Sequence, residues 1–107
     1  MSRFLSVNSE SIGKAYFTGK LYNIHNYPGA ILSTNPSESV YGTVYKITDV
    51  DNVFEVLDRY EGVAENLFKR VTVNAHLSSG EILKTWVYIY NRSVATKTRI
   101  YSGDYLN

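Results

Sequence analysis

The stretch that decides the fold is residues 48–62, which read TDVDNVFEVLDRYEG. Its apolar side chains recur at the i, i+3, i+4, i+7 spacing of one helical face, namely Val50, Val53, Phe54, Leu57 and Tyr60. Thr48, followed three residues later by Asp51, approximates a capping box, and Gly62 stands where a helix that has just ended often has a glycine. We therefore predict a helix over residues 49–60.

Strands are predicted on both sides of this helix, because the apolar residues there alternate with polar ones. The predicted strands are residues 15–24, 30–32, 39–47, 68–77 and 82–90. Tyr-Pro-Gly at 27–29 and Ser-Ser-Gly-Glu at 78–81 are turn sequences that separate neighbouring strands. The last segment, 91–107, shows no clear period.

This order of elements predicts an α+β fold, a small and mostly antiparallel β-barrel with one helix inserted. Because the connections are short, we expect strands that follow one another in the chain to be neighbours in the sheet. We also expect the sheet to curl into a partial barrel.

Composition narrows the classes of partner. The chain has 107 residues, which is the size of one domain, and its formal net charge of +1 gives no field that would favour nucleic acid. Stacking of bases on the ten tyrosines is disfavoured for the same reason. There is no cysteine and no apolar run of roughly 18 residues, so we expect a cytoplasmic protein without a membrane partner.

Glu61 is the candidate for chemistry. A helix C-terminus carries a partial negative charge, so a carboxylate there does not stabilise the helix and its ionised form is disfavoured. A carboxyl group that exchanges protons near neutral pH needs this environment. The alternative interpretation is an ordinary solvated glutamate at a helix end.

A series of motifs resembles the gamma-glutamylcyclotransferase-like (AIG2-like) family over about residues 13–105. The motifs are GKLY (19–22), NYPG (26–29), VYGTVY (40–45), LDRYEG (57–62), TWVYIY (85–90) and SGDY (102–105). The resemblance implies that Glu61 is the acid/base residue and that the fold is a small mixed barrel with helices packed outside. The implied reaction releases 5-oxoproline from a gamma-glutamyl amine or peptide by intramolecular aminolysis, with no metal and no cofactor.

Other residues are candidates for substrate binding or for plain structure. Tyr22, Tyr27 and Gly29 are predicted to line the pocket beside Glu61, although Tyr-Pro-Gly is equally a turn. Tyr88 and Tyr105 are predicted to offer hydroxyl groups to a ligand, with sheet packing as the alternative. The isolated His25 and His76 are predicted to be structural or exposed, and Trp86 to be core or wall.

The sequence departs from the family near its start. The family's first strand carries a Tyr-Gly-x-Leu segment around the glutamyl group, and no such segment precedes Gly13. The similar residues at 41–44 match a later strand of the family by their distance to Glu61. We therefore expect residues 1–107 to be a single domain that is incomplete at its N-terminus and lacks the first strand.

A missing strand leaves two functions open. One is the cyclotransferase, and the other is a catalytically impaired member that binds a small molecule or assembles with itself. An unpaired sheet edge also invites pairing with another copy, so the missing strand makes a homodimer a further hypothesis.

Overall fold

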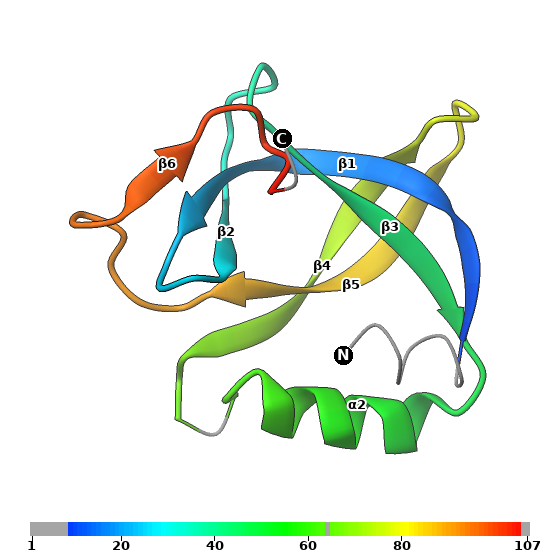
Figure 1. Ribbon diagram of the computed structural model, residues 1–107. Helices are drawn as coiled ribbons and strands as arrows, with labels where there is room; N and C mark the ends of the chain where they lie inside the picture. The colour runs from blue at the N-terminus through cyan, green and yellow to red at the C-terminus, as the bar shows by residue number, and fades with distance from the viewer. Residues whose placement is uncertain (1–8, 64, 106–107) are drawn as a thin grey trace.

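The computed structural model describes residues 9–63 and 65–105, which form a mostly antiparallel sheet of six strands and one helix (Figure 1). The elements follow in the order β1 (Ser9–Asn23), β2 (Pro28–Leu32), β3 (Ser39–Ile47), α2 (Val50–Tyr60), β4 (Phe68–Leu77), β5 (Ile82–Tyr90) and β6 (Thr98–Ile100). The predicted α+β class is confirmed.

Most predicted elements lie where the periodicity placed them. The predicted bounds of β3, β4 and β5 are those of the structure. β1 begins earlier than predicted, at Ser9, and β6 was not predicted at all. β6 has only three residues, too few to produce a period of its own.

The long strand β1 organises the sheet. Its first part pairs with β3 and, around Ala15, with β4, whereas its last part pairs with β2 and β6. The expectation that consecutive strands are neighbours holds for β1–β2 and for β4–β5, but β3 pairs with β1 instead of β2. A strand of 15 residues is long enough to take different partners along its length.

Gly19 is the residue at which β1 changes partner. Thr18 still pairs with Ser39 of β3, and Gly19 pairs with Leu32 of β2. A Cβ atom at Gly19 would lie 2.6 Å from the carbonyl oxygen of Ile31. Only glycine allows the two backbones to approach this closely.

The strands curl as expected, with α2 across one end of the sheet (Figure 1). Among the described strands the barrel does not close, because β3 pairs only with β1 and β5 only with β4. The expectation that the chain is incomplete at its N-terminus stays a prediction.

Helix α2 packs on the sheet through the middle of its apolar face. Val53, Phe54 and Leu57 are buried, whereas Val50 is 48% and Tyr60 is 66% exposed. The middle three of the five apolar residues that share this face are therefore covered, and the first and the last are exposed. Within the described residues, no helix is long and apolar enough to cross a membrane.

The two ends of α2 differ in how they are capped. The N-cap residue is Asp49, whose side chain makes no capping hydrogen bond, so the predicted box with Thr48 at the N-cap was wrong. At the other end, Gly62 has the positive φ of 66° that a residue after a helix commonly adopts. The predicted glycine stop is confirmed.

Candidate functional site

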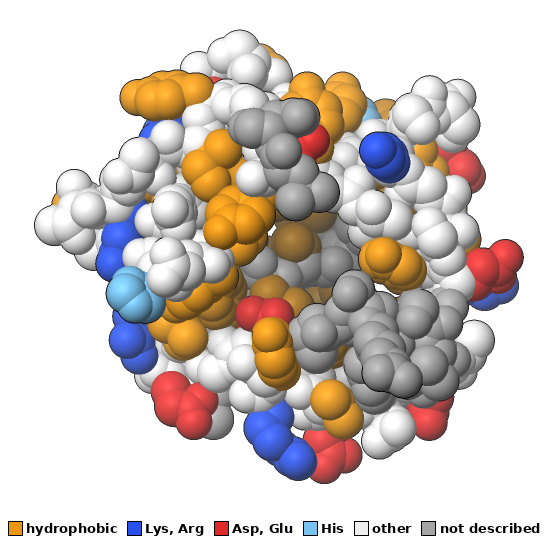
Figure 2. Space-filling model, viewed as in Figure 1, with side chains coloured by type: hydrophobic (Ala, Val, Ile, Leu, Met, Phe, Trp, Pro, Cys, Tyr) orange, Lys and Arg blue, Asp and Glu red, His pale blue; other side chains and the backbone are white. Residues whose placement is uncertain are grey.

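A cavity of about 630 Å³ opens between the sheet and the end of α2. Figure 2 shows this hollowed face, with hydrophobic side chains around the hollow and an acidic side chain at its edge. Its wall includes consecutive residues of β3 and of β5, together with Phe54, Leu57 and Glu61 from the helix and its end. The cavity is thus bounded by β3 and β5, each of which has one strand partner among the described strands, and by the C-terminal end of α2.

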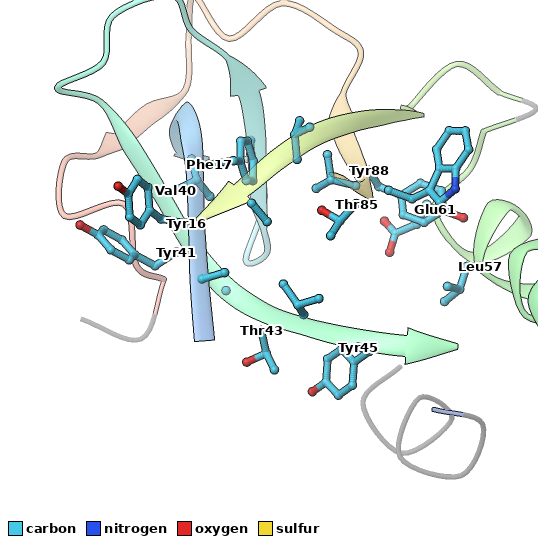
Figure 3. Close-up of a pocket in the computed structure, with 18 of the residues that line it drawn as sticks. Tyr16, Phe17, Val40, Tyr41, Thr43, Tyr45, Leu57, Glu61, Thr85 and Tyr88 are labelled. Atoms are coloured by element: carbon cyan, nitrogen blue, oxygen red, sulfur yellow. The ribbon is translucent and has the colours of Figure 1, made fainter. Parts of the chain in front are cut away.

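Glu61 is held at the cavity by the geometry of the helix end. Its amide donates to the carbonyl of Leu57 over 2.8 Å, and Gly62 and Val63 donate to the carbonyls of Arg59 (3.3 Å) and Asp58 (3.0 Å). These last two bonds are those of a Schellman motif, which the positive φ of Gly62 makes possible. Figure 3 shows the carboxyl group of Glu61 in the cavity wall, between Leu57 and Tyr88.

The Glu61 carboxyl group is half-buried, and burial raises its pKa. The sequence predicted this direction from the helix end, whereas in the structure burial of the carboxyl group is the cause that raises the pKa. A carboxyl group with a raised pKa binds and releases a proton closer to neutral pH than an exposed glutamate does.

Tyr88 lies beside Glu61 and is tied to the helix. Its hydroxyl group donates a short hydrogen bond to Oδ1 of Asp58, and Arg70 Nε lies 3.4 Å from the same oxygen. Burial, followed by the hydrogen bond to Asp58, raises the pKa of Tyr88, so the phenol stays protonated. The side chains of α2, β4 and β5 therefore meet at one point next to the carboxyl group.

The structure places three of the predicted substrate-binding residues away from this cavity. Among its described lining residues, Tyr22, Tyr27 and Gly29 are absent, although Pro28 and Ala30 are present. Tyr22 packs against the cluster of Ile24, Phe68 and Tyr90, and the ring of Tyr27 is 6.3 Å from that of Phe68. That these three residues bind a substrate stays a prediction. They do not line the cavity that Glu61 lines.

Tyr105 lines a second, smaller cavity of about 370 Å³. Tyr16, Tyr41 and His76 line it as well, and the rings of Tyr16 and His76 stack with their centroids 4.9 Å apart. The structure therefore brings Glu61 and Tyr88 together and places Tyr105 at a second cavity, which adjoins the first through shared lining residues such as Tyr16 and Tyr41.

Several polar groups in the main cavity were not singled out from the sequence. Thr43 and Tyr45 of β3 and Thr85 of β5 contribute hydroxyl-bearing side chains to its lining (Figure 3). The alternation of β3 puts Thr43 and Tyr45 on one face of the strand. This alternation was the sequence signal that could have identified both as residues of one site. No local pattern could have identified the contacts of Asp58 with Arg70 and Tyr88, because these residues come from different elements.

Nothing in the described part of the chain gathers three or more His, Asp or Glu side chains in a way that could hold a metal ion. His25 is exposed, and His76 is stacked on Tyr16. The predicted wall position of Trp86 agrees with its place in the cavity lining.

The fold and this cavity define a class: a small α+β protein with a curled antiparallel sheet and a half-buried carboxyl group in the cavity wall at a helix end. The profile of the family described as "Gamma-glutamyl cyclotransferase, AIG2-like" matches residues 2–107, and the chain belongs to this family. The crystal structure of the uncharacterized protein PH0828 from Pyrococcus horikoshii is similar, with a TM-score of 0.70 and 18% sequence identity. That match covers 98% of this chain and 77% of the other, and it supports the fold alone. A comparison with curated protein sequences found no match.

Proposed function

We propose that the protein is a gamma-glutamyl cyclotransferase that releases 5-oxoproline from a gamma-glutamyl amine or peptide. The observation that carries the proposal is the Glu61 carboxyl group, half-buried in the wall of a cavity large enough for a small molecule, in a member of this family.

The reaction needs one group that moves a proton. The α-amino nitrogen of the substrate attacks its own γ-carbonyl carbon, so a C–N bond forms within the five-membered ring. The amide C–N bond to the leaving amine then breaks. Glu61 takes a proton from the attacking nitrogen and delivers it to the leaving nitrogen, so that atoms and charge balance without water or a cofactor.

The raised pKa of Glu61 suits both halves of this transfer. A carboxyl group of ordinary acidity is a weak base toward the amine, whereas burial strengthens it as a base. The surrounding apolar wall also strengthens the electrostatic interaction of the carboxylate with the attacking amine.

The test is the release of 5-oxoproline from a panel of gamma-glutamyl amines, amino acids and peptides. Glu61→Gln keeps the shape of the side chain but removes the proton carrier, so turnover should fall by about 10²–10⁴-fold. Glu65→Gln is the matched control, because Glu65 is an exposed carboxylate in the turn after the same helix. Turnover that Glu61→Gln leaves unchanged would remove the mechanism.

A second candidate is a binding or self-assembling module without turnover. Two observations favour it: Lys84 is the one cationic side chain among the described residues of the cavity lining, and β3 and β5 each have a single strand partner among the described strands. A substrate carboxylate would then have few charged partners, and an open strand could pair with a second copy. Light scattering that shows a dimer, together with no turnover on any substrate of the panel, would favour this candidate.

We place the protein in the cytoplasm in either case, since a chain without cysteine gains nothing from an oxidising compartment. Fluorescence microscopy of the tagged full chain tests this location.

A further inference from the structure

One carboxylate oxygen of Asp58 contacts two side chains, Tyr88 and Arg70. The hydroxyl group of Tyr88 donates to Oδ1, and Nε of Arg70 lies 3.4 Å from the same atom. Both Asp58 and Arg70 are largely covered, with 31% and 28% of their side chains exposed. Asp58 is therefore a charged acceptor fixed at the interface between α2 and the sheet.

Arg70 is itself held by aromatic rings. Its guanidinium carbon lies 4.1 Å from the ring centroid of Phe54 and 5.0 Å from that of Trp86. Stacking of this kind orients the planar guanidinium group and favours its position beside Asp58. The pair cannot turn away without losing these contacts.

The bond to Asp58 decides what Tyr88 can do in the cavity. A tyrosine hydroxyl group has one proton, and an ionised carboxylate can only accept hydrogen bonds. Because the proton of Tyr88 is directed at Asp58, the phenolic oxygen presents lone pairs to any ligand beside Glu61. Tyr88 is therefore an acceptor in this site and not a donor.

Two acceptors side by side select a ligand group that carries several N–H donors. Glu61 and Tyr88 both line the same part of the cavity, at the C-terminal end of α2, where the helix adds a partial negative charge (Figure 3). A γ-carbonyl oxygen or a carboxylate would be repelled there. An amino group satisfies both acceptors.

We propose that Asp58 and Arg70 are positioning residues that fix Tyr88 as the acceptor for the substrate's α-amino group, next to Glu61. This inference rests on the proposed function. Tyr88 would hold one N–H of the amine while Glu61 takes another proton, which aims the nitrogen lone pair at the γ-carbonyl carbon.

Binding can test the inference separately from turnover. In the Glu61→Gln background, the affinities for gamma-glutamyl-p-nitroanilide and for glutaryl-p-nitroanilide, which lacks the α-amino group, are measured by calorimetry. Adding Asp58→Asn allows the amide to donate to Tyr88 and removes the fixed direction of the hydrogen bond. We expect affinity for the gamma-glutamyl probe to fall about tenfold and affinity for the glutaryl probe to stay the same.

A double-mutant cycle shows whether Asp58 acts through Tyr88. Tyr88→Phe removes the acceptor, so Asp58→Asn should have little further effect on binding of the gamma-glutamyl probe in that background. Arg70→Lys keeps the charge beside Asp58 and should retain more affinity than Arg70→Met. Asp51→Asn, an exposed change on the same helix, is the control and should leave both affinities as they are.

Three results would overturn the inference: equal losses for both probes, no loss for either, or additive effects of Asp58→Asn and Tyr88→Phe. Failure of the parent Glu61→Gln protein to bind either probe would overturn it as well. Absence of 5-oxoproline release by the wild-type protein, with amine-dependent binding intact, would count against the proposed function alone.

Discussion

Arg99 Nη2 lies 2.9 Å from Oε2 of Glu38, which joins strand β6 to the residue just before β3. Ser33 donates a hydrogen bond to the same glutamate, and Lys20 is 3.9 Å from it. The hydrogen bond from Ser33, followed by the charges of Lys20 and Arg99, lowers the pKa of the Glu38 carboxyl group. This carboxylate thus adds a side-chain link between β6, which already pairs with β1, and the start of β3.

Stability should therefore depend on the ionisation of Glu38. Because its pKa is lower in the folded than in the unfolded protein, this contribution is fully present above the ordinary glutamate pKa. It is lost as the pH falls through the lowered value. Glu38→Gln should reduce the melting temperature at neutral pH, and the difference from wild type should shrink in acid.

The measurement is thermal unfolding across the acid range for wild type, Glu38→Gln and Glu81→Gln. Glu81 is an exposed carboxylate in the hairpin between β4 and β5, so its replacement should change the melting temperature little at any pH. A constant difference between Glu38→Gln and wild type, independent of pH, would contradict this assignment.

Gly62 is needed for its backbone conformation. Its φ is 66°, and a Cβ atom there would lie 3.2 Å from Cβ of Leu67. Gly62→Ala should cost about 1 kcal/mol or more of unfolding free energy, because an L-residue is strained at positive φ. Urea denaturation measures the loss.

Gly42→Ala is the matched control for Gly62. A Cβ atom at Gly42 meets nothing within 4 Å, and this strand position has no positive φ. Its unfolding free energy should be equal to or slightly above that of wild type. Equal effects of the two substitutions would show that the helix end tolerates a side chain.

The sequence predicted those parts of the fold that local patterns specify. The middle turns of α2, and the hairpin of β4 and β5, depend on periodicity and on turn residues such as Gly80, which has a positive φ. β6 has no local signal, because its three residues form a strand only by pairing with β1. Spacing alone also does not say how far a sheet covers a helix, and Val50 and Tyr60 at the two ends of the apolar face are exposed.

The candidate site could be predicted only in part. Glu61 stood out because a helix end and a glycine mark its position, and alternation drew attention to Tyr88. The bond between Tyr88 and Asp58 joins residues 30 positions apart and has no sequence signal. The sequence predicted that the sheet curls but not which side chains the curl brings together, so it did not place Tyr22 in the cluster with Phe68 or Tyr105 at the second cavity.

Leu57 lies one helical turn before Glu61 and anchors this end of α2 in the core. It is 8% exposed and packs with Val53 and Phe54. Leu57→Ala should lower the unfolding free energy by about 2–5 kcal/mol, because it leaves a cavity under the helix. Val50→Ala is the control on the same predicted face, and its exposed position should limit the loss to about 0.5 kcal/mol.

Both variants are compared by urea denaturation, with the slope of the transition checked for each. A large loss for Val50→Ala would mean that the whole predicted face is covered in solution, contrary to its 48% exposure.

The burial that suits Glu61 for proton transfer should also destabilise the fold at neutral pH. Because its pKa is raised above the ordinary value of 4.5, the folded protein binds this proton more tightly than the unfolded chain does. The contribution of Glu61 to stability is therefore most favourable below the ordinary value and becomes less favourable as the pH rises through the window up to the raised pKa. Tyr88 and the Asp58–Arg70 pair face the carboxyl group from the sheet and the helix, and Tyr88 stays protonated throughout.

At pH values above the raised pKa of Glu61, the Glu61→Gln variant should thus be more stable than wild type, and at pH values below the ordinary glutamate pKa it should be no more stable. The same variant should lose turnover. Thermal unfolding of wild type, Glu61→Gln and Glu65→Gln at pH values on both sides of the window measures the effect. The exposed Glu65 should show no such pH-dependent gain. A Glu61→Gln variant that is less stable than wild type at neutral pH would mean that the ionised carboxylate has a stabilising partner. Glu61 would then be a structural residue of the helix end, and its place in the proton transfer would have to be given up.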